Sequence, residues 1–271
     1  MDSDNTVERA LYATKWADLK HYSGTFSRVY FGNEFCQRLI PSTEELEQVL
    51  DFVSEKRLAF TFVTPYVTDE GLRILEPLLQ KIEETKPDSE VVVNDWGMLH
   101  RLNERYPKLE PVMGRLLHKM KRGPRLMNLL DILPQTTINY FMGCSLDSPL
   151  YRRFLVGRGI RRVELDNLLQ GIALGLSHTG ISGSLYLPYA YITTTRLCLA
   201  AASDVSGNED EIGIFPCQKQ CQKYTFLLTH PVMPLPIIRK GNTMFFKNEK
   251  VPENIREGNI NRIVVEPEVP L

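Results

Sequence analysis

The stretch 28–65, RVYFGNEFCQRLIPSTEELEQVLDFVSEKRLAFTFVTP, holds two apolar runs with a helix-like segment between them. RVYFG (28–32) predicts a short buried strand that ends at a glycine. STEELEQVLDFVSEKR (42–57) begins with two residues that favour a helix N-cap, and its apolar residues recur at helical spacing. LAFTFVTP (58–65) predicts a second strand. A strand, a helix and a strand in this order predict two parallel strands joined by a right-handed crossover.

The same alternation continues over most of residues 28–200. Further helices are predicted at 68–84, at 98–105, within 148–160 (ending at Gly157 or Gly159) and at 167–177. Further strands are predicted at 89–95, 108–117, 161–166 and 182–198, whereas LPQTTINYFMG (133–143) predicts an extended loop or strand. Neither GxGxxG nor GxxxxGK[ST] occurs at a strand-to-helix turn, so a phosphate-binding loop is not expected. The pattern favours an α/β fold with a (β/α) barrel of the TIM type over a doubly wound sheet. The sequence leaves open whether the barrel is complete, incomplete or distorted.

The chain changes character after residue 222 and becomes rich in proline. Two short apolar runs, IIRK and MFF, flank KGNT (240–243) and predict a hairpin. The last segment, NRIVVEPEVPL (261–271), is expected to add an edge strand or to remain a mobile end. We therefore predict a barrel-like domain at 1–225 that carries the cysteines, and a β-rich C-terminal extension at 226–271 packed on it.

Charge and hydropathy narrow the class of protein. Lys and Arg number 32 against 33 Asp and Glu, so the net charge of −1 creates no overall attraction to nucleic acid or to an anionic membrane. No apolar run approaches the roughly 20 residues that span a bilayer, and the first residues, MDSDNTVERALYATKW, are too polar for a secretory signal. A cytoplasmic location without a membrane span is expected.

The chain contains five cysteines, at 36, 144, 198, 217 and 221. A reducing compartment disfavours disulfides, so grouped cysteines point to metal ligands or catalytic thiols. Cys217 and Cys221 are one helical turn apart or lie across a tight loop, and the loop 200–216 is expected to fold back and bring Cys198 near them. Cys36 and Cys198 follow predicted strands and are expected on the same face of a barrel. The residues alone suggest four ligands for zinc or an iron-sulfur cluster, with Cys144 as a core residue.

Four short pieces of the chain resemble the collagenase-like peptidase family of U type, number thirty-two, and especially its UbiV-like branch. VYFGNEFCQR matches a Tyr-x-Gly-x-x-x-Cys segment at Tyr30, Gly32 and Cys36, and VVVNDWGML matches a strand-turn segment at Asn94, Asp95 and Gly97. TTRLCLAAAS and CQKQC are similar to the branch's Arg-Cys segment and later Cys-x-x-x-Cys pair. The resemblance extends over roughly residues 25–225.

This resemblance implies that Cys36, Cys198, Cys217 and Cys221 bind one [4Fe-4S] cluster. It implies a protein that acts with a paralogous family member, as a heterodimer, in the oxygen-independent hydroxylation of a small aromatic substrate such as a ubiquinone precursor. Two alternatives remain. One is a peptidase of the same family, for which the sequence offers no recognisable Cys/His or Ser/His pair and no catalytic zinc triad. The other is a scaffold with structural zinc that binds RNA or a partner protein.

Two basic stretches and several strand-end residues bear on these alternatives. The arginines in 115–125 and 152–162 suit phosphates or an acidic partner, although a solvated helix face is the favoured interpretation. The five histidines lack metal-ligand spacing and are expected on the surface or in the core. Polar residues at predicted strand ends lie where barrel enzymes place their chemistry, or cap the next helix: Asn94, Asp95, Glu164 and Asp166, with Asp166 or Asn167 expected to cap 167–177.

Overall fold

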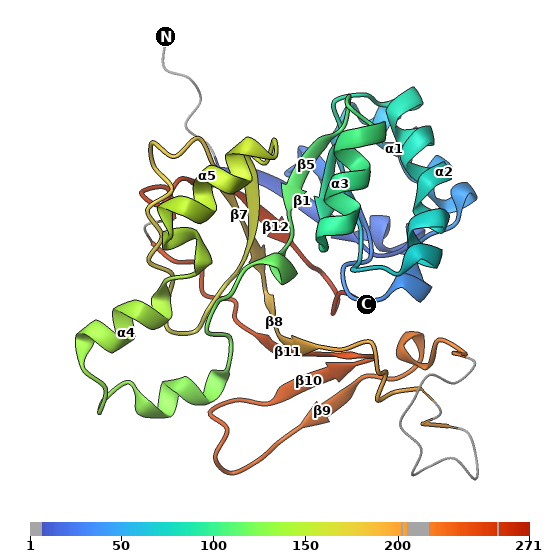
Figure 1. The fold of residues 1–271 in the computed structure, drawn as a ribbon. Coiled ribbons are helices and arrows are strands. Elements are labelled where there is room, and N and C mark those ends of the chain that lie inside the picture. Colours follow the sequence, from blue (N-terminus) through green and yellow to red (C-terminus); the bar gives the residue numbers. More distant parts are fainter. Residues whose placement is uncertain (1–6, 202, 205–216, 254) are drawn as a thin grey trace.

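The structure is a computed structural model that describes residues 7–201, 203–204, 217–253 and 255–271. Eight parallel strands close into a barrel in the order β1-β12-β7-β6-β5-β4-β3-β2 (Figure 1). The predicted barrel is confirmed, and it is complete. Its strands are β1 (Glu8–Ala13), β2 (Arg28–Gly32), β3 (Ala59–Val63), β4 (Glu90–Val93), β5 (Glu110–Met113), β6 (Arg162–Asp166), β7 (Ser182–Leu187) and β12 (Ile260–Val265).

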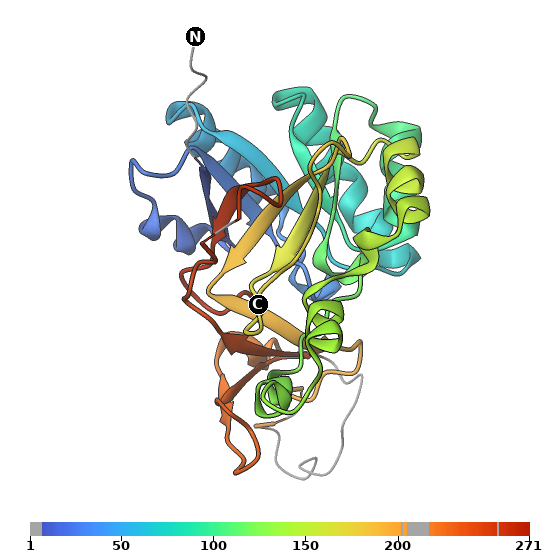
Figure 2. The same ribbon diagram turned by 90° about the vertical axis from the view of Figure 1, so that its left-hand side faces the viewer.

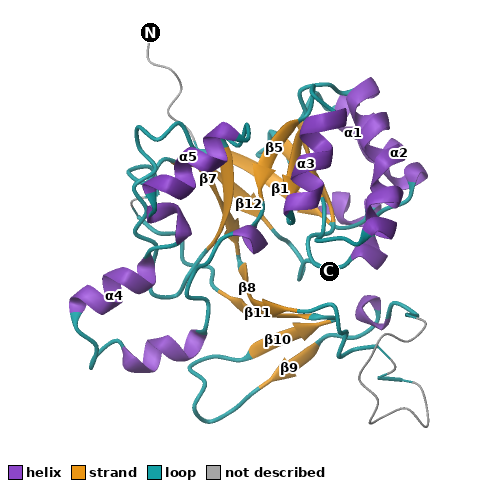
Figure 3. Ribbon diagram, in the orientation of Figure 1, coloured by secondary structure: helices purple, strands orange, loops and turns teal. Residues whose placement is uncertain are grey.

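Helices cover part of the outer wall of the barrel. The helices α1 (Thr43–Glu55), α2 (Asp69–Thr85) and α3 (Trp96–Arg105) lie on one side, and α5 (Pro149–Gly157) lies on the other (Figure 3). The first predicted helix forms as expected, with Ser42 Oγ accepting a hydrogen bond from the Glu45 amide at 3.2 Å and with its apolar face buried. The helices are α1 (Thr43–Glu55), α2 (Asp69–Thr85), α3 (Trp96–Arg105), α4 (Gln135–Met142) and α5 (Pro149–Gly157).

Two predictions about local structure are wrong. Residues 167–177, expected to be helical, run irregularly from β6 to β7. Gly171 there has a φ of +88°, which interrupts helical geometry. Residues 133–143, expected to be extended, contain α4, which begins directly after Pro134 on an arm that projects from the barrel (Figure 1). The β-branched residues at the start of this helix favour a strand in isolation, whereas in the structure they follow Pro134, which occupies the N-cap position of α4.

The chain between the barrel strands β7 and β12 forms a second sheet, which is antiparallel and has the strand order β8-β11-β10-β9. Both views place it beyond one end of the barrel (Figures 1 and 2). The predicted hairpin around KGNT is confirmed as the β10–β11 turn. The strands of this sheet are β8 (Tyr189–Thr194), β9 (Phe226–Leu228), β10 (Ile237–Lys240) and β11 (Thr243–Lys247).

The pairing of two strands differs from the prediction. The stretch 182–198, expected as one strand, divides at Pro188 into β7 of the barrel and β8 of the small sheet. The last segment is neither an edge strand nor a free end, because β12 pairs with both β1 and β7 and closes the barrel. The division into 1–225 and 226–271 stays a prediction. The small sheet includes β8, which precedes residue 225, and the barrel includes β12, which follows residue 226.

The interior of the barrel is layered. Three buried tyrosines, Tyr12, Tyr30 and Tyr186, meet edge to face in the middle, with ring centroids 6.0 to 6.5 Å apart. At the amino ends of the strands, Arg262 pairs with Glu90 and Glu8, at 2.6 Å in each case. The carboxyl ends of the strands face the small sheet, and the candidate sites lie there. In the described residues no helix is long and apolar enough to cross a bilayer; residues 1–6, at the start of the polar N-terminal segment, lie outside that range.

Candidate cysteine site

Four of the five cysteines line one cavity of about 40 Å³. Cys36 comes from the loop after β2, and Cys198 from the segment after β8. Cys217 and Cys221 precede β9, and Cys221 lies in a 3-10 turn, Gln220–Gln222. The four thiols therefore converge from three separate segments. The loop expected to join Cys198 to the pair lies largely outside the described residues, at 202 and 205–216.

Within the described parts of the chain, three of these sulfur atoms accept hydrogen bonds. The Arg38 amide donates to Cys36 Sγ, and the Lys219 amide donates to Cys217 Sγ at 3.4 Å. The Gln222 side-chain amide donates to Cys221 Sγ at 3.8 Å. Donors aimed at sulfur stabilise negative charge there, as they do around metal-bound thiolates.

The thiols are shielded from water, and this affects their protonation. Burial, together with the neighbouring cysteine sulfurs, raises the pKa of Cys36 to about 11, against the smaller opposing effect of the Arg38 amide. Burial also raises the pKa of Cys221, and Cys198 and Cys217 add to the effect. At neutral pH these two groups are therefore thiols, and only a bound cation would hold them as thiolates.

Positively charged side chains surround the cavity. Arg38 and Arg196 are among its lining residues. Lys240 lies close enough to Cys221 to lower the pKa of that thiol, and its ammonium group donates to the Val269 carbonyl at 2.9 Å. These charges would offset part of the negative charge of several thiolates.

One glycine permits the close packing of this region. Gly241, in the β10–β11 turn, lines the cavity with a φ of +56°. A Cβ atom there would lie 3.0 Å from Cys221 Cβ and 2.6 Å from Leu271 Cδ2. Both the backbone conformation and the space thus favour glycine at this position.

The donor set and the space suit a metal centre, although the ligands are not drawn together. Four thiols suit zinc or an iron-sulfur cluster, and a water molecule needs only about 10–15 Å³ on the same measure, so the cavity has room for more than one atom. Among the described residues, the structure contains no group of three or more Cys, His, Asp or Glu side chains arranged closely enough to hold a metal ion. Cys144 is not in the lining; it packs against the main core, near Tyr151.

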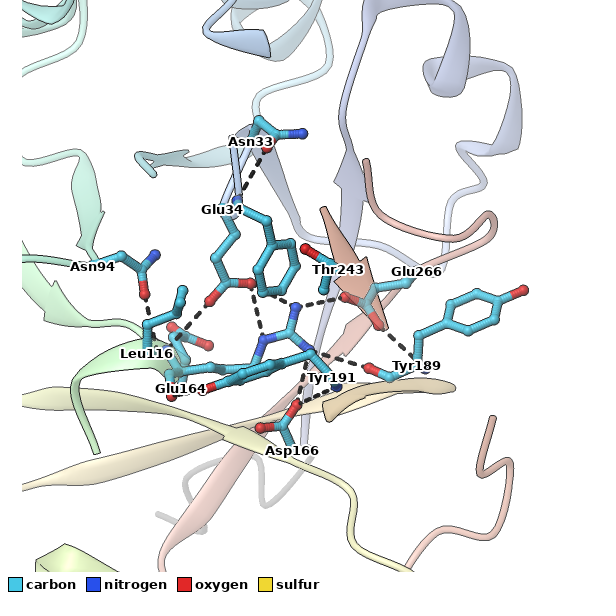
Figure 4. A network of polar contacts seen from close by, with 12 residues as sticks. Asn33, Glu34, Asn94, Leu116, Glu164, Asp166, Tyr189, Tyr191, Thr243 and Glu266 are labelled. Carbon is cyan, nitrogen blue, oxygen red and sulfur yellow. Dashed lines mark hydrogen bonds and ion pairs between the residues drawn. The ribbon is translucent and has the colours of Figure 1, made fainter. Parts of the chain in front are cut away.

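A second polar cluster lies at the carboxyl end of the barrel, where Glu34, Asp166 and Glu266, labelled in Figure 4, surround the side chain of Arg115. This side chain is 0% exposed and contacts three carboxylates. It lies 2.6 Å from Glu34, 3.2 Å from Asp166 and 3.0 Å from Glu266. Its guanidinium also donates to the Tyr189 carbonyl at the start of β8, so the cluster ties the barrel to the small sheet.

This cluster corrects the prediction for the first basic stretch. Arg115, His118 and Arg122 are 0%, 3% and 8% exposed, so they do not form a solvated helix face. Arg122 pairs with Asp166 at 2.6 Å. The two guanidiniums face three carboxylates, and burial raises the pKa of Glu266 to about 8, so one proton is retained in the cluster at neutral pH.

The predicted strand-end residues have different roles. Asp95 caps α3, because its Oδ1 accepts from the Met98 amide at 2.7 Å. Asn94 instead holds a loop, donating to the Thr64 carbonyl. Asp166 and Asn167 do not cap a helix, since none follows them; Asn167 donates to the Asn248 and Lys250 carbonyls.

Glu164 is fully buried inside the barrel, and burial raises its pKa to about 8. It accepts a hydrogen bond from the Tyr30 hydroxyl at 3.0 Å. His118 Nε2 donates to the Glu164 carbonyl at 2.6 Å, and burial lowers the pKa of this histidine to about 4, so it is neutral. The described lining of the cysteine cavity contains no histidine.

Glu34 and Glu266 were not identified as site residues from the sequence. Glu34 follows β2 and Glu266 follows β12, so both take the strand-end position that drew attention to Asp166. Glu266 lies at the barrel mouth only because β12, the strand that it follows, is part of the barrel wall, and the sequence did not predict that position for β12.

Comparisons with known proteins add little beyond the overall architecture. No family model matches the chain, and no curated protein does. Among solved structures it is similar to the U32 peptidase Mk0906, with a TM-score of 0.49 and 12% identity over 99% of this chain and 96% of that chain. It is also similar to human YKL-39, a pseudo-chitinase with retained chitooligosaccharide binding, with a TM-score of 0.37 and 10% identity over 96% of this chain and 92% of that one. Neither score can carry a function from one protein to another, so the function has to be inferred from the chain's own residues.

Proposed function

We propose that Cys36, Cys198, Cys217 and Cys221 bind one [4Fe-4S] cluster. The observation that carries this proposal is their convergence on one cavity, whereas the fifth cysteine lies elsewhere. Four thiols that are not in disulfides and that meet from three segments would supply the full ligand set of such a cluster.

The surroundings of the thiols also support this proposal. Four thiolates give the centre a net negative charge, which Arg38, Arg196 and Lys240 would offset. The amide donors of Arg38 and Lys219 point at sulfur. Charge and hydrogen bonds of this kind tune the reduction potential of a cluster.

Metal uptake would complete the assembly of the site. Because the thiols are not grouped as a metal site here, binding would draw them together and release their protons. Part of the binding free energy would then stabilise the contact between the barrel and the small sheet. Cys36 lies in the loop after the barrel strand β2, and Cys221 lies in the turn before β9 of the small sheet.

We further propose a role in oxygen-independent hydroxylation of a small aromatic substrate such as a ubiquinone precursor, together with a paralogous partner. The four short motifs around Tyr30, Asn94, Cys198 and Cys217 support it by resemblance. A cluster at this site would supply electron transfer. The chain's own residues would hold it, shield it from water and place a substrate beside Cys36.

The test is anaerobic purification followed by an absorption spectrum and assays of iron, sulfide and zinc on one sample. We expect a brown protein with iron and sulfide in equal amounts, in about four of each per chain. Single Cys→Ser variants at 36, 198, 217 and 221 should lose iron, and Cys144→Ser is the matched control that should retain it. Full iron content in the four variants would refute the proposal.

Structural zinc is the second candidate, since the same four thiols suit tetrahedral zinc. A colourless, air-stable protein with about one zinc per chain would establish it and would remove the support for hydroxylation. In that case the scaffold function, with RNA or a partner bound by exposed arginines such as Arg153, becomes the leading proposal. Cleavage of gelatin by protein that lacks metal would instead favour a peptidase.

A further inference from the structure

A second cavity adjoins the cysteine cavity. Its volume is about 290 Å³, close to that of typical small-ligand pockets. It shares Cys36, Arg38, Arg196 and Asn242 with the cysteine cavity. A molecule in this outer pocket would therefore lie directly beside a thiol of the inner site.

We propose that this outer pocket binds a small organic carboxylate, and this rests on the proposed function of the inner cysteines as the metal centre. Among the described residues that line the pocket, Arg38 and Arg196 supply guanidinium groups and Glu70 supplies the acidic side chain. A guanidinium matches a carboxylate in both charge and shape, with two parallel hydrogen bonds.

Contacts with neighbours hold Arg196 in position. Its Nη2 donates to the Val67 carbonyl at 3.2 Å, and its guanidinium carbon lies 5.5 Å from the centroid of the Tyr66 ring. A guanidinium fixed in this way loses little freedom when it binds an anion.

The Tyr66 side chain gives the pocket a flat apolar wall; Phe35 also belongs to the lining, but its ring is 0% exposed and packs inward against Tyr191. Asn242 fixes this wall, because its side-chain amide donates to the Phe35 carbonyl at 2.8 Å and to the Tyr66 hydroxyl at 3.3 Å. A flat aromatic wall together with two guanidiniums in the same lining fits a planar ligand with a carboxylate at one end.

The experiment compares benzoate with its neutral analogue benzamide by calorimetric titration into anaerobically purified protein. We expect benzoate to bind roughly 10- to 100-fold more tightly, because only the anion gains charge-assisted hydrogen bonds. Arg196→Gln and Arg38→Gln should each weaken benzoate binding about 10-fold or more while benzamide binding changes little. Arg158→Gln is the matched control, since this arginine is exposed and lies over Phe154 on α5.

Iron and zinc are assayed on the same samples, so that the two proposals fail separately. Benzoate discrimination in protein that holds no metal supports the pocket and overturns the cluster. Metal-loaded protein that binds benzoate and benzamide equally, or neither, overturns the pocket and leaves the cluster standing. Unchanged benzoate affinity in both arginine variants, with thermal unfolding as in the parent protein, also overturns the pocket.

Discussion

The buried carboxyl group of Glu164 should make the free energy of unfolding depend on pH. Its carboxyl group is 0% exposed, one oxygen accepts from Tyr30, and the other has no hydrogen-bond partner in the described chain. The Arg262 guanidinium donates to the Tyr30 hydroxyl at 2.7 Å, so Tyr30 lies between this positive charge and the Glu164 carboxyl group. Burial therefore dominates and raises the pKa of Glu164 from 4.5 to about 8.

The sign of the effect follows from proton linkage. In the native state Glu164 binds its proton more tightly than in the unfolded state, so the stability it contributes is fully present below pH 4.5 and is lost as the pH rises through 8. At roughly 1.4 kcal/mol per pKa unit, this group alone should lower the free energy of unfolding by about 2 kcal/mol between pH 6 and pH 8.

Replacing Glu164 with Gln tests this, because the amide keeps an oxygen for the Tyr30 hydroxyl and does not titrate. Urea unfolding of both proteins at the two pH values gives four free energies. The decline from pH 6 to pH 8 should be smaller in Glu164→Gln by about 2 kcal/mol, while other groups such as Glu266 contribute equally to both proteins. Glu253→Gln, at an exposed position, is the control and should decline as the parent protein does. Equal declines in the parent protein and Glu164→Gln would refute the assignment of a raised pKa.

Three further predictions concern the barrel mouth and the cysteine cavity. Arg115→Met leaves three buried carboxylates without their shared cation and should lower the free energy of unfolding by about 3–5 kcal/mol in urea titrations, whereas the exposed Arg125→Met should change it little. Gly241→Ala should lower the midpoint of thermal unfolding and the metal content, because its Cβ would press on Cys221; Gly123→Ala, with open space at its Cβ, is the control. Apparent metal affinity, measured by competition with a chelator, should rise by about tenfold or more per pH unit near neutrality, because the Cys36 thiol, with a pKa of about 11, must release its proton. Stability of Arg115→Met equal to that of the parent, a full metal content in Gly241→Ala, or a pH-independent affinity would each contradict the corresponding argument.

The predicted elements that proved correct are those with strong local signals. The helix α1 has an N-cap serine and apolar residues at helical spacing, and the strands β2, β3 and β4 are short runs of mostly apolar residues. These patterns depend on neighbours in the chain, so the sequence displays them directly. The five cysteines are equally visible in the sequence, and their use as metal ligands stays a prediction.

The elements that were misjudged depend on distant contacts. The segment of β12 resembles a terminal edge strand, and only its pairing with β1, more than 240 residues earlier in the chain, places it in the barrel wall. Residues 167–177 carry apolar residues at helical spacing, but the glycine at 171 and the irregular crossover to β7 decide their conformation.

The sequence by itself determined the alternation of strands and helices, the hairpin at β10–β11 and the supply of thiols. Tertiary structure alone decided which groups meet. Arg115 and Arg125 belong to the same basic stretch, yet Arg115 is buried because carboxylates 81, 51 and 151 residues away surround it. The four cysteines likewise gather only because the small sheet packs on the barrel mouth through Phe35 and Tyr191. Burial and charge pairing are properties of a folded surface, so residues with the same local pattern can end in water or in the core.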